Sequence, residues 1–183
     1  MIERLFRDGM VVARSDGTVH HLVPVAIGAA EGEALRDWVT REGATHTIEI
    51  GLGYGISALF ACQGVLRNSD PAASPVVVDP YPVALPRSLA EGRRFDLAFV
   101  DGNHRFDGIF VDLTYLGRLL RPGAIVLVDD DQLPAIARAA SFFVTNLNWT
   151  LEEVSPVDEL HQWAALRTSA VPDMRSFDDY VEF

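Results

Sequence analysis

A short apolar run, followed by a glycine-rich turn and a helical pattern, is the feature that most constrains the fold of this chain. Residues 45–50 form the apolar run, residues 51–55 read Gly-Leu-Gly-Tyr-Gly, and a helical pattern follows to about residue 66. The same alternation of β-type runs with helical patterns continues along the rest of the chain. This alternation is typical of an α/β domain in which helices cover a mostly parallel sheet.

The pattern predicts the elements in detail. The predicted strands are 45–50, 75–79, 95–101, 124–128, 150–154 and 161–166. The predicted helices are 31–41, the segment from the glycine turn to about 66, 86–93, 106–120 and 134–147. We expect one domain over residues 1–183, with an N-terminal extension and helix at 1–44, a core at 45–168 and a tail at 169–183. The acidic and aromatic end of the tail, 176–183, is either a dimer arm or frayed.

Charge and composition exclude several classes of function. The net charge is −11 and the isoelectric point is near 4.7, whereas nucleic acids are bound mainly through clustered lysine and arginine. We therefore expect no nucleic-acid partner. All 15 basic residues are arginine, so a lysine base, a lysine Schiff base and a phosphate-loop lysine are excluded.

The chain also has no pattern of a membrane or secreted protein. No apolar run reaches the ~20 residues that a membrane span needs, and the N-terminus lacks the apolar stretch of a secretory signal. The single cysteine, Cys62, excludes an internal disulfide and fits a reducing compartment. We expect a cytoplasmic protein that does not contact membranes.

Acidic residues end the strongest predicted strands. These residues are Glu49, Asp79, Asp101 and Asp129. In open α/β sheets, ligands bind beyond the carboxyl ends of the strands. Buried carboxylates at that edge need a ligand, a metal or backbone amides as partners. The sequence therefore predicts a binding site at this edge of the sheet.

The glycine turn lies at the same edge. Gly51, Gly53 and Gly55 carry no Cβ atom that would block a ligand from the backbone, and the following helix offers free N–H groups. A dinucleotide-binding turn spaces its glycines differently, because its third glycine would fall where Ile56 lies here. Glu49, just before the turn, also suits a cationic ligand better than a pyrophosphate. The alternative is a tight strand-to-helix turn that binds nothing.

Two further motifs carry a resemblance to a known family. The segment 49–55, read as E-x-G-x-G-x-G and followed by Asp79, resembles the first motifs of class I S-adenosylmethionine (SAM) dependent methyltransferases. The segment 95–104 is similar to the F-D-x-x-F-I-D-G-x-H signature of an O-methyltransferase-like group, methyltransferase domain 24. Residues 121–123 and 128–130 match its next element, and the similarity extends from about residue 31 to residue 168.

The resemblance implies a fold, a cofactor and a reaction. The fold is a Rossmann-like, doubly wound, mostly parallel sheet. The reaction is SAM-dependent methylation of a small molecule, most simply at oxygen, by a homodimer; the acceptor itself is not identified. The residues that would bind SAM are Glu49, Gly51, Gly53, Gly55, Ser57, Asp79 and Asp101.

Metal and catalytic residues also follow from the resemblance. In metal-dependent members, the acids that match Asp101, Asp129 and Asp130 bind Mg²⁺, which orients the acceptor hydroxyl and lowers its pKa. The alternative is structural: Asp129 would cap the helix that begins near residue 133, and Asp101 would shape its own turn. Asp101 and His104 are the candidate catalytic residues. His104 is either the general base or a histidine that stabilises its loop.

The sequence departs from the family between its second and fourth strands. Only residues 80–94 separate Asp79 from Phe95, where the family has a helix, a strand and a second helix. Either the domain is shortened here or the sequence lacks a segment between Asp79 and Pro86. We expect the second case, because a shortened sheet would leave the strand 75–79 as an uncovered edge.

Two other functions stay open at this point. The first is a non-catalytic relative that keeps the fold for cofactor binding or dimerisation. The second is a nicotinamide-dependent oxidoreductase, which the glycine spacing disfavours.

Overall fold

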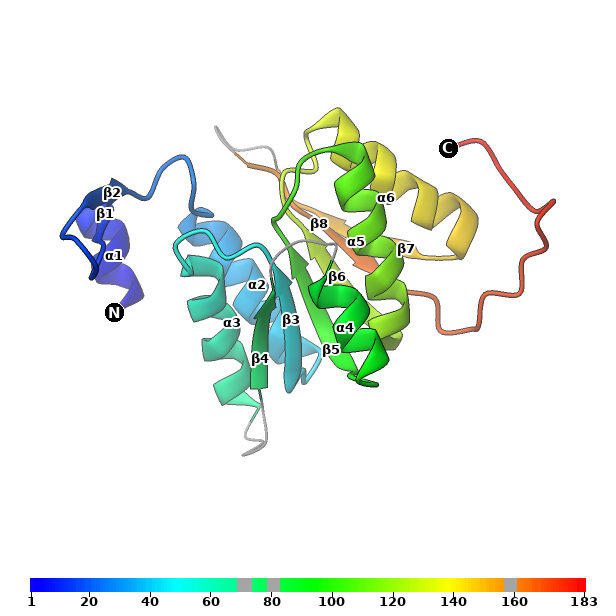
Figure 1. The fold of residues 1–183 in the computed structure, drawn as a ribbon, viewed down its shortest axis with the longest axis horizontal. Helices are drawn as coiled ribbons and strands as arrows, with labels where there is room; N and C mark the ends of the chain where they lie inside the picture. The colour runs from blue at the N-terminus through cyan, green and yellow to red at the C-terminus, as the bar shows by residue number, and fades with distance from the viewer. Residues whose placement is uncertain (69–73, 79–82, 157–160) are drawn as a thin grey trace.

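The computed structural model describes residues 1–68, 74–78, 83–156 and 161–183, and it has the predicted α/β architecture (Figure 1). The main sheet has six strands in the order β4-β3-β5-β6-β8-β7. Its strands are β3 (His46–Ile50), β4 (Ser74–Val78), β5 (Phe95–Val100), β6 (Leu120–Val128), β7 (Thr150–Val154) and β8 (Ala164–Arg167). The helices around it are α2 (Ala29–Arg41), α3 (Ile56–Arg67), α4 (Ala84–Ala90), α5 (Phe106–Leu119) and α6 (Pro134–Leu147).

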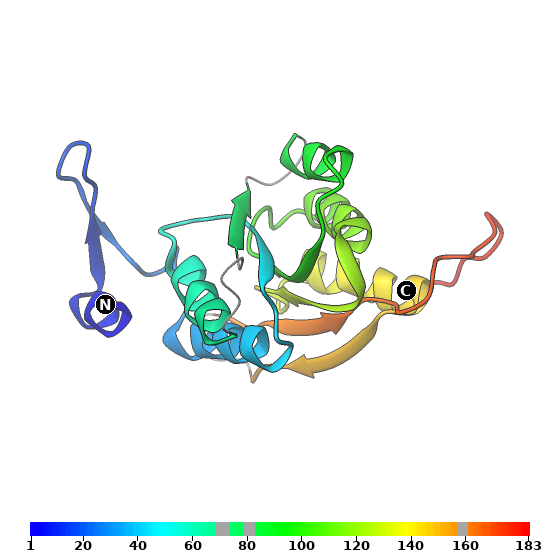
Figure 2. The same cartoon turned by 90° about the horizontal axis from the view of Figure 1, so that it is seen from below.

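Helices cover both faces of the sheet, as expected for a doubly wound fold (Figures 1 and 2). Side chains alternate along a strand, so each central strand supplies both faces. Leu97 and Phe99 of β5 belong to the core with α2 and α3, whereas Ala98 and Val100 belong to the core with α4, α5 and α6. Trp149 and Trp163 are buried and belong to these two cores.

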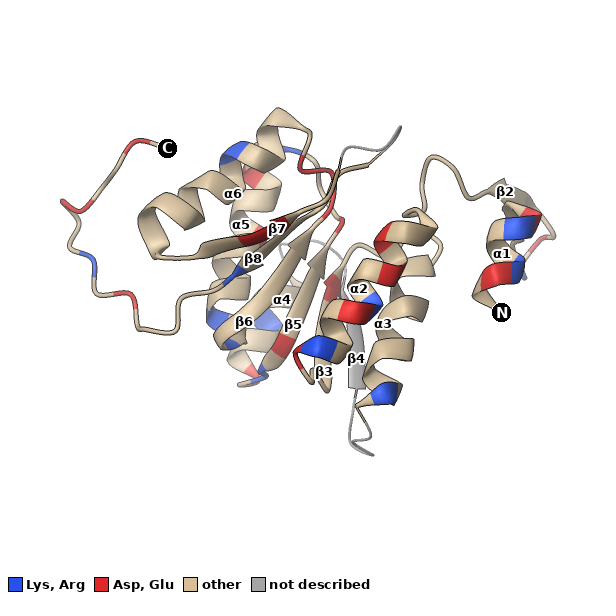
Figure 3. Ribbon diagram, turned by 180° about the vertical axis from the view of Figure 1, so that it is seen from behind, with Lys and Arg blue, Asp and Glu red and all other residues tan. Residues whose placement is uncertain are grey.

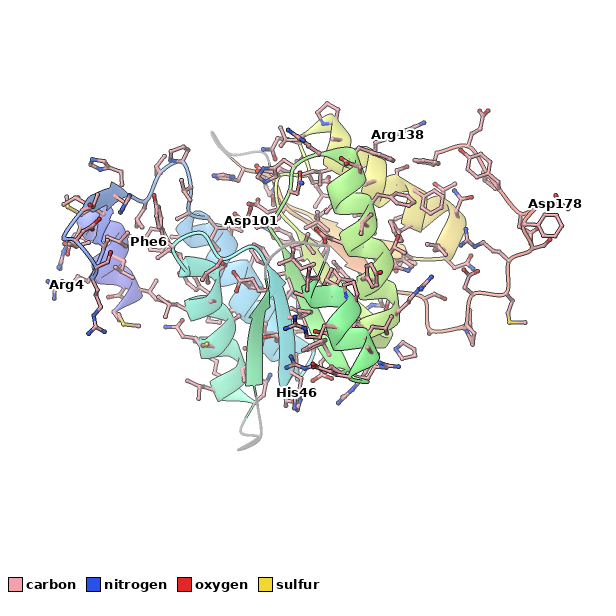
Figure 4. The ribbon with its side chains drawn as sticks, viewed as in Figure 1. Arg4, Phe6, His46, Asp101, Arg138 and Asp178 are labelled. Carbon is pink, nitrogen blue, oxygen red and sulfur yellow. The ribbon has the colours of Figure 1, made fainter. Side chains whose placement is uncertain are left out.

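The parallel register aligns the ends of four strands. Ile50 lies opposite both Val78 and Val100, and Val100 lies opposite Val128. The residues that follow β5 and β6, Asp101 and Asp129, therefore emerge at one edge, as the sequence predicted. Figure 4 places Asp101 at this edge and His46, the first residue of β3, at the opposite edge.

One strand, β8, runs opposite to its neighbours β6 and β7. β8 is antiparallel to β6, with Val128 opposite Ala164. The amino end of β8 therefore lies beside the carboxyl end of β6, and the backbone N–H of Asp131 donates to the carbonyl of Gln162 at 2.7 Å. The segment before β8 thus reaches the edge that carries Asp101 and Asp129.

Some element boundaries differ from the predictions. β6 begins at Leu120 and not at the predicted residue 124, because Leu120 pairs with Phe95 before the register shifts. β8 begins at Ala164 instead of residue 161. α4 begins at Ala84 and ends at Ala90, slightly earlier than predicted.

The N-terminal extension has structure that the sequence did not predict. It forms α1 (Ile2–Asp8) and a hairpin of β1 (Met10–Val12) and β2 (Val19–His21). The rings of Phe6 and Phe60 lie 6.2 Å apart, which packs α1 against α3 (Figure 4). The extension lies at one end of the molecule, and the C-terminal tail lies at the other end (Figure 2).

The shortened interval lies beside β4. Within the described residues, β4 pairs with β3 alone and is an edge strand, and α4 is the element that precedes β5. The predicted missing segment would fall between Asp79 and Pro86, and residues 79–82 lie outside the described residues. That part of the expectation stays a prediction. In the described part of the chain, no helix has the length and apolarity needed to cross a membrane.

Candidate active site

The glycine turn is packed so closely that it excludes side chains at its first glycine. Gly51 has φ 92°, and a Cβ atom there would lie 1.9 Å from the backbone carbonyl oxygen of Asp101. The N–H of Asp101 donates to the carbonyl of Ile50 at 2.9 Å, which holds the two strand ends together. Gly53 and Gly55 have φ values of 48° and 76°, and Gly55 is the N-cap of α3. The turn therefore presents bare backbone at the edge of the sheet.

Glu49 is a buried acid directly beneath this turn. Its Oε1 atom accepts a hydrogen bond from the Ser57 hydroxyl on the first turn of α3. Burial raises the pKa of Glu49 to about 7, although the Ser57 hydrogen bond acts against this shift and the charge of Asp101 adds to it. Glu49 is thus poised to change its charge near neutral pH.

His104 joins two of the predicted acids. Its Nε2 atom lies 3.1 Å from Asp130 Oδ2 and 3.5 Å from Asp101 Oδ1. The hydrogen bonds that His104 donates to Asp101 and Asp130 raise the pKa of His104 to about 10, and the bond accepted from His104 lowers the pKa of Asp130 to about 2. His104 is therefore protonated at neutral pH in this arrangement. This favours the stabilising role over the general-base role.

Asp129 belongs to a second, more buried group. Its Oδ1 atom accepts a hydrogen bond from the Asp130 N–H at 2.6 Å, and its Oδ2 atom lies 3.9 Å from His161 Nδ1. The ligand atoms of Asp129, Glu31 and His161 all lie within 4.8 Å of one another. Burial, followed by the charge of Asp129, raises the pKa of Glu31 to about 10. Acidic segments lie along α2 and in the loops at this edge (Figure 3).

Sequence reasoning missed Glu31 and His161. Glu31 is four residues before Leu35 and seven before Trp38, so it lies on the apolar stripe of α2, and this placement was the available signal. His161 gave no such signal. It reaches the site because β8 is antiparallel, and a rule based on the carboxyl ends of parallel strands does not include the residue before such a strand.

Two further positions need separate comment. Asp79 lies outside the described residues, so its role in SAM binding stays a prediction. The Oδ1 atom of Asn103 accepts a hydrogen bond from the Arg105 N–H at 2.9 Å. Asn103 therefore shapes the turn before α5.

The predicted Mg²⁺ residues fit a divalent cation by charge and by donor type, since hard carboxylate oxygens suit Mg²⁺. The described residues nevertheless form two groups, each with an imidazole: Asp101 and Asp130 with His104, and Asp129 with Glu31 and His161. Imidazole suits first-row transition cations better than Mg²⁺. Binding of Mg²⁺ by Asp101, Asp129 and Asp130 thus stays a prediction.

A cavity of about 420 Å³ lies between the N-terminal extension and the start of α2. His161 lines it together with residues 26–29 of the segment leading into α2 and with Phe6 and His21 of the extension. The buried acid group therefore has a neighbouring space large enough for a small molecule.

Part of the chain matches a known family. Residues 75–130 match the model of methyltransferase domain 24, described as a methyltransferase domain. No curated protein matches the chain.

Solved structures show the same methyltransferase fold. An O-methyltransferase from Bacillus cereus in complex with SAH has a TM-score of 0.67 at 14% identity, covering 92% of this chain and 90% of that one. TomG from Streptomyces achromogenes, an O-methyltransferase of tomaymycin synthesis in complex with SAM, has a TM-score of 0.61 at 18% identity, covering 80% and 83%. An SAH-bound methyltransferase from Podospora anserina has a TM-score of 0.60 at 18% identity, covering 79% and 80%.

Proposed function

We propose that this domain binds SAM at the glycine turn and transfers its methyl group to an oxygen atom of a small molecule. The observation that carries the proposal is the Gly51 turn, where bare backbone lies against the Asp101 carbonyl directly above the buried Glu49. The family match over residues 75–130 and the cofactors bound by the similar structures support SAM as the ligand.

The binding residues have distinct roles in this proposal. Gly51, Gly53 and Gly55 let the cofactor lie against the backbone. Glu49 supplies negative charge toward the cationic ligand, and Ser57 holds the Glu49 carboxylate in place through its hydrogen bond. Asp79 keeps the role given by the resemblance, which is to bind the ribose hydroxyls.

The transfer itself requires little covalent chemistry from the protein. The acceptor oxygen attacks the methyl carbon, the carbon–sulfur bond breaks, SAH and a methyl ether form, and the hydroxyl proton passes to Asp101 and from there to water. In-line positioning of the two reactants supplies much of the rate enhancement. We assign Asp101 to accept a hydrogen bond from the acceptor hydroxyl, and His104 to hold Asp101 in position. A divalent cation bound by the acids would lower the pKa of that hydroxyl.

We place the acceptor in the cavity of about 420 Å³ beside His161. The N-terminal extension forms one wall of this cavity, so its sequence would contribute to acceptor specificity. Phenols and catechols suit a mostly apolar pocket with a few polar groups, and we propose hydroxylated aromatic compounds as the acceptor class.

A methyl-transfer assay tests the function. The full chain is incubated with SAM and a panel of phenols, catechols and sugars, and both SAH and the mass of each acceptor are measured. We expect SAH together with an acceptor heavier by one methylene unit. SAM binding without any methylated product across the panel would instead favour the non-catalytic relative.

The proposal includes a homodimer in the cytoplasm. The tail exposes large apolar side chains, with Met174 at 87% and Phe177 at 97% exposure, and a second copy could cover them. The cytoplasmic assignment rests on the single cysteine. Light scattering of the full chain measures the dimer directly, and a monomer mass at micromolar concentration would rule it out.

A further inference from the structure

The strongest unexplained feature of the site is the carboxylate of Glu31. Its side chain is 5% exposed, and both of its oxygen atoms are buried without a hydrogen-bond partner. A buried carboxyl group is costly without a partner. Burial and the neighbouring Asp129 raise the pKa of Glu31 to about 10, so the carboxyl keeps its proton at neutral pH unless a cation replaces it.

The surroundings of Glu31 define what that partner is. Asp129, 2% exposed, and His161 offer ligand atoms within 4.8 Å of Glu31 and of each other. In the described part of the chain, no ion pair joins an arginine to Glu31 or to Asp129, and the sequence has no lysine. The group thus presents two buried acids and an imidazole to one point.

We propose that Glu31, Asp129 and His161 bind a divalent first-row transition cation, at a site separate from the group formed by Asp101, His104 and Asp130. Two carboxylates and an imidazole form a donor set that suits Mn²⁺, Co²⁺ or Zn²⁺ better than Mg²⁺. His161 Nδ1 lies 3.9 Å from Asp129 Oδ2 and 3.2 Å from Asp130 Oδ1, so the ring is already held at the edge of the acid group.

The two groups differ in exposure and in the position of the imidazole. In the outer group, the His104 imidazole lies between Asp101 and Asp130 and is 45% exposed. In the inner group, both carboxylates are buried and His161 lines the neighbouring cavity. A cation in the inner group would therefore be reached from that cavity. This inference concerns cation binding, and it does not depend on whether SAM binds at the glycine turn.

Calorimetric titration with CoCl₂ tests the proposal on the chelator-treated full chain. We expect one Co²⁺ per chain, with affinity reduced at least tenfold by Glu31→Gln and by His161→Gln. Glu33→Gln is the matched control, because Glu33 is an exposed acid on the same helix and should leave the affinity unchanged. Asp101→Asn should change it less than threefold.

Three results would overturn the proposal: no Co²⁺ binding, equal affinity for Glu31→Gln and Glu33→Gln, or loss of binding in Asp101→Asn but not in Glu31→Gln. Thermal unfolding shows whether each variant is folded. Should Glu31→Gln fail to fold, the wild-type chain decides the question through its imidazole nitrogen NMR signals with ZnCl₂. The signals of His161 must then shift while those of His104 stay in place, and the reverse pattern contradicts the proposal.

Discussion

Gly51 is where the glycine turn approaches β5 most closely. Substitution by alanine would strain the left-handed backbone and would also place a Cβ atom 1.9 Å from the Asp101 carbonyl oxygen. We expect Gly51→Ala to lower the free energy of unfolding and to weaken SAM binding at least tenfold. Denaturant unfolding and calorimetry measure the two effects.

Gly92→Ala is the control for this substitution. Gly92 has a similar left-handed φ of 70°, and a Cβ atom there meets nothing within 4 Å. Its cost should be the backbone strain alone, about 1–2 kcal/mol, with no effect on SAM binding. Equal stability losses in the two variants would show that the contact with Asp101 does not matter.

Glu49 gives the site a dependence on pH. Its pKa of about 7 means that the carboxyl is largely neutral at pH 6 and largely ionised at pH 8. If the carboxylate form binds the cationic cofactor, the affinity for SAM should rise about tenfold between these pH values, and binding near pH 7 should release protons. Calorimetry in two buffers of different ionisation enthalpy measures that release.

The same shift affects the stability of the free protein in the opposite direction. The folded chain holds the Glu49 proton more tightly than the unfolded chain, whose pKa is near 4.5. The resulting stabilisation is complete below pH 4.5 and is lost as the pH rises to about 7. Glu49→Gln should remove the pH dependence of SAM affinity and that of stability. If the variant kept the wild-type change of SAM affinity with pH, Glu49 would not act on the cofactor.

At the scale of elements, Asn146 of α6 holds the C-terminal tail through two hydrogen bonds. Asn146 donates to the carbonyl of Val181 at 2.9 Å and accepts from the N–H of Val181 at 2.8 Å. Asn146→Ala removes both hydrogen bonds, so we expect a loss of about 1–3 kcal/mol in unfolding free energy and faster proteolysis of the tail. Thr145→Ala is the control, because Thr145 is exposed on α6 and its replacement by alanine changes helix propensity about as much as Asn146→Ala does. Equal proteolysis rates in the two variants would mean that other contacts hold the tail.

The direction of the strands and the buried face of α2 determine which site residues could be predicted from the sequence. Asp101 and Asp129 were predictable, because parallel strands bring their carboxyl ends to one edge and the strands themselves are plainly apolar. The partner of Asp129 was harder to predict. Glu31 looked like an ordinary acid in the first turn of a helix, and only its position on the buried stripe indicated otherwise. His161 depended on the direction of β8, which periodicity does not reveal.

At the scale of the whole molecule, the apolar periodicity of the sequence predicted the central fold, but it did not predict the structure of the N-terminal extension. The core helices and strands carry strong apolar periodicity, so their existence was predictable and their boundaries moved by a few residues. α1 and the hairpin of β1 and β2 are short, and β1 and β2 have largely exposed side chains. Such short segments carry too little periodicity to indicate structure, although they form one wall of the cavity that we assign to the acceptor.

Binding of SAM is the claim on which the rest of the account depends, and calorimetric titration of the full chain with SAM, SAH and NAD tests it most directly. We predict micromolar affinity for SAM and for SAH, no detectable binding of NAD, and at least tenfold weaker SAM binding in Gly51→Ala than in Gly92→Ala. Binding of NAD in place of SAM, or no binding of SAM by a folded chain, would contradict the account.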